Sequence, residues 1–85
     1  MKQFSYVVKD PDGIHARPAG KLVKMAQSLT SGIVVKCRGK EADMKKLLGL
    51  MSLGAKQGDT LSITVMGGEE AHDAHTLLQF LSETV

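Results

Sequence analysis

The spacing of the apolar residues changes along this chain, and that change constrains the fold more than any other feature. Apolar residues stand at every second position in residues 2–8, 33–37 and 60–66, which is the pattern of strands with one buried face. Elsewhere they recur at spacings of three and four, as on amphipathic helices. The sequence therefore predicts a mixed α/β chain, and its 85 residues suffice for a single domain over residues 1–85.

Turn residues divide this pattern into strands and helices. The predicted strands are 2–8, 33–37, 40–43 and 60–66, and the predicted helices are 16–27, 46–53 and 69 to the last residue. Asp10–Gly13 and Gly67–Gly68 end strands, Arg38–Gly39 forms a tight hairpin, and Gly54 stops a helix. The order β-α-β-β-α-β-α predicts an α/β (α+β) fold, an open-faced β-sandwich with helices on one face of an antiparallel sheet.

The same periodicities predict which side chains are buried. The expected core residues are Phe4, Tyr6, Val8, Ala19, Leu22, Val23, Ala26, Leu29, Ile33, Val35, Cys37, Leu61, Ile63, Val65, Ala71, Ala74, Leu78 and Leu81. Cys37 is the only cysteine, so an internal disulfide is excluded and a small core residue is expected there.

The charge balance is mixed rather than strongly basic. Eleven Lys and Arg residues against nine Asp and Glu residues leave a net charge of +2, with no basic stripe, which argues against nucleic-acid binding. No apolar run is long enough for a signal sequence or a membrane span. We therefore expect a cytoplasmic monomer that does not insert into a membrane.

Residues 13–18 carry the residue types that phosphoryl transfer needs. His15 stands where the first predicted helix begins, and the free backbone N–H groups of a helix N-terminus bind phosphate. Arg17 can donate a planar fork of hydrogen bonds to phosphate oxygens. The helix dipole and Arg17 are expected to disfavour the protonated imidazole and so keep it nucleophilic. The sequence near His15 shows no general base and no metal-ligand cluster, which favours a carrier over a hydrolase. The alternative to a phosphoryl-transfer site is that His15 only caps the helix and Arg17 is a solvated surface charge.

Two segments resemble the HPr family, the histidine-containing phosphocarriers of the bacterial sugar phosphotransferase system. They are Gly13–Ala19 and Lys45–Gly54, and their spacing, the chain length and the element order also match. The resemblance implies a four-stranded antiparallel sheet with three helices. It implies that His15 accepts phosphate at Nδ1 from phosphorylated enzyme I, which phosphoenolpyruvate charges, and donates it to sugar-specific IIA proteins. It also implies that Arg17 orients the phosphate and that the N–H groups of Ala16 and Arg17 bind it. From the residues themselves we expect no cofactor and no metal.

The second predicted helix carries more apolar residues than one buried stripe accounts for. We expect part of it to be an exposed docking patch for several partners. The resemblance implies that Leu47, Leu48 and Met51 contact both donor and acceptor beside the histidine. The polar rim is predicted to contain Lys24, Gln27, Lys45 and Lys46, with Gly20 leaving space next to the site.

Position 46 departs from the resemblance. Many HPr proteins have a serine there. In Gram-positive bacteria an ATP-dependent kinase phosphorylates it, which slows phosphoryl transfer at the histidine and recruits a transcriptional repressor. Lys46 cannot be phosphorylated in that way, so we expect this regulation to be absent or altered. A paralogue with a regulatory or nitrogen-branch role is a further alternative.

Three other functions were weighed against the carrier. The first is a metal site, because His72, Asp73 and His75 cluster on the last helix and its two histidines could share a metal. No third ligand is evident nearby, and an exposed polar helix face explains the cluster equally well. A nucleic-acid or ligand-binding module would need exposed strand aromatics, whereas Phe4 and Tyr6 are expected in the core. A stand-alone enzyme lacks an acid–base pair.

Overall fold

The computed structural model describes all residues from Met1 to Val85. Four strands form one sheet in the order β1-β4-β2-β3, and every neighbouring pair is antiparallel. The elements are β1 (Lys2–Val7), α1 (Ala16–Ser28), β2 (Gly32–Cys37), β3 (Lys40–Asp43), α2 (Leu47–Ser52), β4 (Thr60–Met66) and α3 (Glu70–Thr84). The predicted order and class are confirmed, and the predicted bounds differ from these by one residue at several ends.

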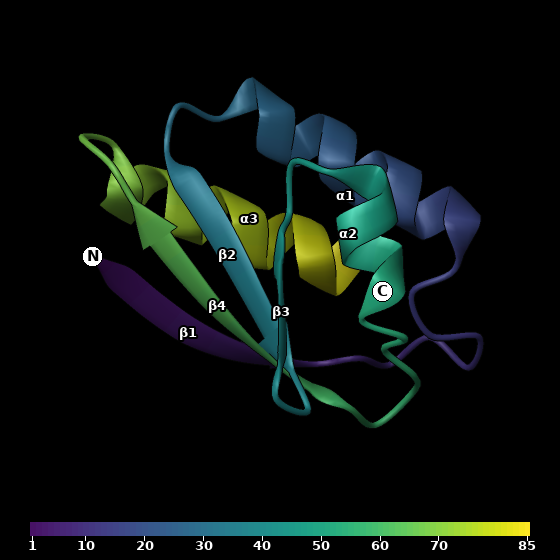
Figure 1. Cartoon of the computed structure of the whole chain (residues 1–85). Coiled ribbons are helices and arrows are strands. Elements are labelled where there is room, and N and C mark those ends of the chain that lie inside the picture. The colour runs from purple at the N-terminus through teal and green to yellow at the C-terminus, as the bar shows by residue number, and fades with distance from the viewer.

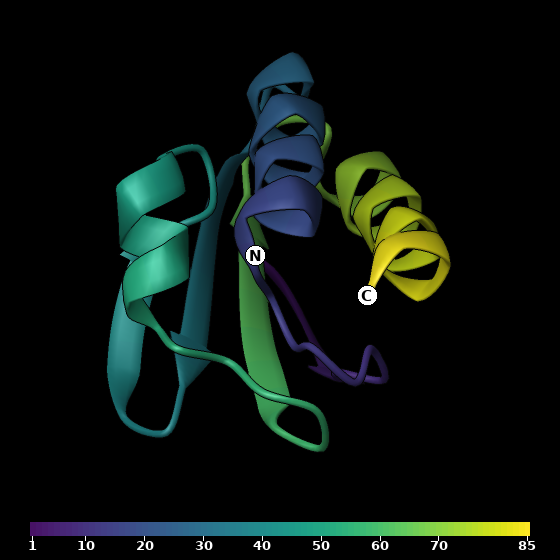
Figure 2. The ribbon, with the colours of Figure 1, turned by 90° about the vertical axis from the view of Figure 1, so that its right-hand side faces the viewer.

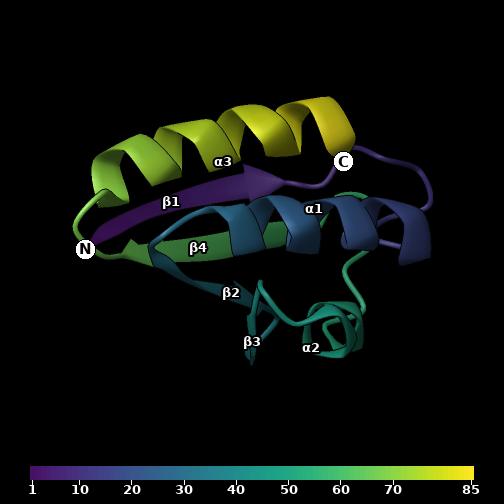
Figure 3. The same cartoon turned by 90° about the horizontal axis from the view of Figure 1, so that it is seen from above.

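All three helices lie on one face of the sheet (Figure 1). Seen along the sheet, α1 lies between the other two, with α2 on the side of β2 and β3 and α3 on the side of β1 (Figures 2 and 3). The other face of the sheet is left open, as expected for an open-faced sandwich. None of the helices is both long and apolar enough to cross a membrane.

The core fills the space between the sheet and the helices. Twenty buried apolar residues form one cluster, which includes Tyr6, Cys37 and the inward residues of β2 and β4. Phe4 and Leu29 are partly buried and pack against it. Tyr6 and Phe4 therefore face the core, and the strands present no aromatic platform on which nucleic-acid bases would stack.

The predicted inner face of the last helix is partly wrong. Leu81 is buried and Ala74 packs against the core, but Ala71 is exposed and Leu78 is 39% exposed. Leu77 and Asp73 are buried in their place. A stripe through 73, 77 and 81 has the four-residue spacing of a helix face. The prediction missed it because it placed Asp73 on an exposed polar face, where carboxylates usually lie.

Two glycines shape the loops near the start of α1. Gly13 has a φ of +67°, and a Cβ there would lie 2.4 Å from the carbonyl oxygen of Ala55. The next residue, Ile14, donates its N–H to the same oxygen at 3.0 Å. Gly54 follows α2 with a φ of +61°, which confirms the predicted left-handed stop. The segments before α1 and after α2 are thereby held together by their backbones.

Candidate functional site

His15 is the N-cap residue of α1. Its backbone is extended (φ −97°, ψ −175°), and its carbonyl accepts the N–H of Ala19 at 2.9 Å. The imidazole makes no capping hydrogen bond, and the side chain is 43% exposed. His15 therefore begins the helix through its backbone, which leaves the ring free for chemistry and removes the capping role as an explanation for the side chain.

The first turn of α1 leaves two backbone N–H groups without intrahelical partners beside His15. They belong to Ala16 and Arg17, because Pro18 has no N–H. No carboxylate lies within the first turn to occupy these donors. These two free donors lie at the positive end of the helix dipole, where an anion can bind.

A shallow hollow of about 220 Å³ opens beside the imidazole. Its lining consists of Asp10, His15, Arg17, Pro18, Lys21, Glu83 and Thr84. Arg17 and Lys21 are four residues apart, so they lie on the same face of α1. The hollow therefore joins the start of α1 to the end of α3, with both positive and negative side chains around the histidine.

The sequence prediction missed four of these lining residues. Lys21 could have been predicted, since it stands one helical turn after Arg17 and therefore lies on the same helix face. Asp10 lay in the predicted turn, but nothing in the sequence showed that its side chain faces the histidine. Glu83 and Thr84 are brought to the site only by the packing of α3 beside α1, which no local spacing in the sequence indicates.

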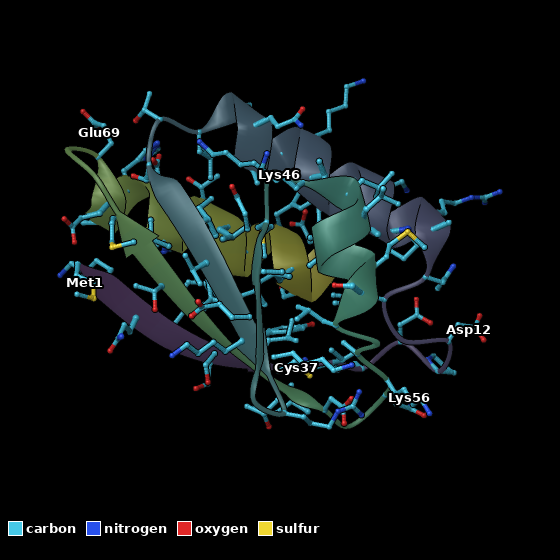
Figure 4. The ribbon with its side chains drawn as sticks, viewed as in Figure 1. Met1, Asp12, Cys37, Lys46, Lys56 and Glu69 are labelled. Carbon is cyan, nitrogen blue, oxygen red and sulfur yellow. The ribbon has the colours of Figure 1, made fainter.

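Two carboxylates approach the imidazole from the loop before α1. Asp10 Oδ2 lies 3.8 Å from His15 Nε2. Metal-ligating atoms of Asp10, Asp12 and His15 all lie within 4.8 Å of one another. Figure 4 shows Asp12 on the outer side of this loop. This trio is the one such grouping in the chain, and it corrects the expectation that no cluster of metal-ligating groups adjoins His15. The polar cluster at His72 and His75 does not gather a third ligand.

The second helix exposes the apolar residues that were predicted to dock partners. Leu48 is 83% exposed, Leu47 42% and Met51 37%, whereas Leu50 and Leu53 are buried. Seen from the end where α1 begins, α2 lies beside α1 (Figure 2). We call the exposed set of Leu47, Leu48 and Met51 the α2 patch.

The predicted polar rim is partly tied to the protein itself. Lys45 Nζ donates to the Leu29 carbonyl at 2.9 Å, and Gln27 Nε2 donates to the Lys45 carbonyl at the same distance. These contacts hold α2 against α1, so Gln27 and Lys45 have a structural role besides any partner contact. Lys24 and Lys46 are exposed and make no such contact. Figure 4 shows Lys46 where α2 begins.

Gly20 lies within α1 and is partly exposed. A Cβ built there meets no atom within 4 Å. The predicted open space at this position is therefore real, and no contact inside the protein requires glycine.

Asp73 has a structural setting rather than a place in a metal cluster. It is buried, and its Oδ2 accepts the backbone N–H of Ser31 at 3.1 Å. The nearby Ser31 hydroxyl lowers the pKa of Asp73 most. Burial opposes this shift, and the Ser31 N–H lowers the pKa further. Asp73 thus joins the start of α3 to the segment between α1 and β2.

Comparisons with known proteins place this arrangement in a family. The sequence profile described as "PTS HPr component phosphorylation site" matches residues 2–83. This chain belongs to the HPr family. The resemblance predicted from Gly13–Ala19 and Lys45–Gly54 is therefore confirmed, and HPr proteins are phosphocarriers.

Individual HPr proteins match over nearly the whole chain. The phosphocarrier protein HPr of Lysinibacillus sphaericus is 41% identical over 83 residues, which cover 98% of this chain and 94% of that protein. The histidine-containing phosphocarrier of a mycoplasma superposes with a TM-score of 0.93 at 28% identity, covering 98% of this chain and 94% of that one. HPr from Thermoanaerobacter tengcongensis gives 0.92 at 31% identity, with 99% and 94% covered.

Proposed function

We propose that this HPr-family chain carries a phosphoryl group on His15 between proteins of the phosphoenolpyruvate-dependent phosphotransferase system, in the cytoplasm. The donor is phosphorylated enzyme I, and the acceptors are sugar-specific IIA proteins or domains. The chain is a carrier rather than an enzyme, since it accepts the phosphoryl group from one protein, passes it to another and converts no substrate of its own.

One observation supports this function above the others. The imidazole of His15 is exposed at a helix N-terminus, uses no atom for capping, and has two unpaired backbone N–H groups beside it. Such a group can attack phosphorus, and the N–H groups can bind the phosphoryl oxygens afterwards. The hollow is shallow and polar, as suits a site that must open to one protein after another.

Arg17 supports the proposal through its place in the same hollow. Its guanidinium is exposed and makes no hydrogen bond or ion pair within the protein. A free guanidinium can bind two phosphoryl oxygens at once. We infer that Arg17 orients the phosphoryl group at Nδ1, while the N–H groups of Ala16 and Arg17 hold it from the helix end.

The α2 patch is the proposed contact for both donor and acceptor. Exposed apolar side chains that lie beside a reactive group favour a docking surface, and the thioether of Met51 adapts to different partners. Exposed Lys24 and Lys46 would attract acidic partner faces and speed encounter.

The carrier function is tested by incubating the protein with phosphoenolpyruvate and a catalytic amount of enzyme I, followed by intact mass measurement. We expect one added phosphoryl group that is labile in acid and stable in alkali. His15→Ala should gain none. The matched control is His75→Ala, which removes an exposed histidine of α3 and should be phosphorylated like the wild type. No mass gain in the wild type with an active enzyme I would disprove the proposal.

The docking surface is tested by titrating enzyme I with two leucine variants. Leu48→Ala should weaken binding while the free energy of unfolding changes by less than about 0.5 kcal/mol, because the side chain is exposed. Leu78→Ala removes an exposed leucine from α3 and should bind normally. Equal affinities of the two variants would exclude the α2 patch as the contact.

The proposal also covers the regulatory site. Lys46 is the exposed N-cap residue of α2, with no capping hydrogen bond from its side chain. With the serine kinase of HPr proteins and ATP, we expect the wild type to stay unmodified and Lys46→Ser to gain one phosphoryl group. A gain at another residue of the wild type would show that regulation persists elsewhere.

A further inference from the structure

The two carboxylates before α1 belong to neither the phosphate cradle nor the α2 patch. Asp10 stands out because its position is fixed from several sides. Its N–H donates to the Val85 carbonyl oxygen at 2.8 Å, and its own carbonyl accepts the N–H of Gly13 at 2.9 Å. Its Oδ1 accepts the N–H of Asp12 at 2.8 Å. The loop and the end of α3 therefore hold this residue in one place.

Only one oxygen of the Asp10 carboxylate remains unused, and that oxygen faces the histidine. Oδ2 lies 3.8 Å from His15 Nε2. This separation is longer than a hydrogen bond, but it is short enough for a carboxylate charge to act on the ring. A negative oxygen facing a ring nitrogen favours N–H there and disfavours a lone pair.

We propose that Asp10 is the positioning residue of the phosphoryl-transfer site: it holds the hydrogen of neutral His15 on Nε2 and thereby leaves the nucleophilic lone pair on Nδ1. This inference rests on the proposed function. The two ring nitrogens have distinct roles, and the partner of one decides the state of the other.

The same contact serves both directions of transfer. When the Nδ1 lone pair attacks the phosphorus carried by the donor, the new N–P bond forms as the donor's own bond to phosphorus breaks, and that electron pair returns to the donor. The ring of His15 keeps its Nε2 hydrogen and becomes positively charged, opposite Asp10. When the Nδ1–P bond breaks toward the next acceptor, its electron pair returns to Nδ1 and the ring is neutral again.

Several other charged groups lie around the ring, and they define the controls. They are Asp12 from the loop, Arg17 and Lys21 from α1, and Glu83 from α3. Among the carboxylates, only that of Asp10 has an oxygen within 4 Å of a ring nitrogen of His15. Asp12→Asn is thus a matched control, because it removes a neighbouring carboxylate without removing the one that faces Nε2.

The test is a long-range ¹H–¹⁵N spectrum of protein labelled in the histidine rings, recorded with EDTA where the rings are neutral. His15→Ala identifies the His15 signals, and exposed His75 gives the reference tautomer ratio. We expect the ratio of the Nε2–H tautomer to the Nδ1–H tautomer to be at least about threefold higher at His15 than at His75. This difference corresponds to about 0.65 kcal/mol, at 1.36 kcal/mol per factor of ten.

Asp10→Asn should lower this ratio to the reference value or below, because an amide N–H₂ facing Nε2 favours a lone pair there. The variant keeps an oxygen that can accept the N–H of Asp12, and its melting curve checks that it folds. Asp12→Asn should leave the ratio unchanged. The same ratio in wild type and Asp10→Asn would overturn the proposal.

A second measurement separates a positioning role from a merely structural one. The phosphorylated form of Asp10→Asn should lose its phosphoryl group several-fold more slowly at neutral pH, because the positively charged phosphorylated ring is its reactive form. An equal lifetime in wild type and Asp10→Asn would overturn the inference alone, since the wild type would still carry phosphate. If the tautomer difference appeared only with added Zn²⁺ and vanished with EDTA, the trio of Asp10, Asp12 and His15 would be a metal site, and the positioning role would be wrong.

Discussion

Two polar regions lie at opposite ends of α1, which is 13 residues long and therefore on the order of 20 Å. At the N-terminal end, the side chains of His15 and Arg17 are exposed and make no hydrogen bond within the protein. Beyond the C-terminal end, Asp73 is buried and accepts a hydrogen bond from Ser31. We call these the carrier end and the buried junction.

The difference between them follows from what each must do. Groups that exchange a phosphoryl group must keep hydrogen-bonding capacity for a ligand, so they contribute little to folding. Groups that join α3 to the segment before β2 use that capacity within the protein. Gly67 allows this close approach, since a Cβ there would lie 2.9 Å from Ser31 Oγ. Function and stability should therefore be separable by mutation.

After His15→Ala, which should abolish phosphorylation, the largest effect expected on function comes from Arg17→Ala at the carrier end. Loss of one preorganised donor to the phosphoryl group should slow transfer from enzyme I by roughly 10²–10³-fold. The free energy of unfolding should change by less than about 0.5 kcal/mol, because the side chain is exposed. Stopped-flow phosphotransfer and urea unfolding measure the two quantities.

Arg17→Lys is the control for charge alone. It keeps the positive charge but lacks the planar fork of donors, so transfer should be intermediate. A loss of stability in Arg17→Ala as large as its loss of function would break the distinction between the two regions.

Asp73→Ala should have the opposite profile. The Ser31 N–H would be left buried without a partner, which costs about 1–3 kcal/mol of unfolding free energy. Phosphorylation of the folded variant by enzyme I should proceed at the wild-type rate. Urea unfolding and the mass assay test both halves, and Asp73→Asn, whose amide oxygen can still accept the N–H, should lose less.

The buried junction also predicts a pH dependence of stability. The pKa of Asp73 is lowered from its ordinary value of 3.8, chiefly by the Ser31 side chain. The folded protein therefore prefers the charged carboxylate, so this contribution is complete above about pH 3.8 and is lost as pH falls through the lowered pKa. Asp73→Asn should remove this part of the acid destabilisation, which unfolding curves at several pH values would show.

The smallest expected effect is that of Gly20→Ala, one helical turn beyond Ala16. Alanine fits without a contact and favours a helix over glycine, so the variant should be more stable by about 0.5–1 kcal/mol. Thermal unfolding measures the gain. Unchanged transfer to IIA proteins would show that the space at Gly20 serves no partner, and slower transfer would extend the carrier end to this position.

The sequence by itself determined the order and class of the elements. Period-two strands and Gly-rich turns specify local structure over a few residues, so β3 and β4 were predicted with the bounds that the structure has. His15 and Arg17 were identified because their chemistry and the helix start lie within three residues of one another. The exposed part of α2 was predicted because its apolar residues exceed what one face can bury.

Only the tertiary structure decided which side chains meet from distant segments. Glu83 reaches the hollow at His15, and Asp73 reaches Ser31, through the packing of α3, and no local spacing encodes either contact. The burial of Asp73 was missed because a carboxylate is stable in a core only when a hydrogen-bond partner is at hand. Asp10 likewise gained its place opposite Nε2 from backbone hydrogen bonds to Val85 and Gly13, which form only when the chain has folded.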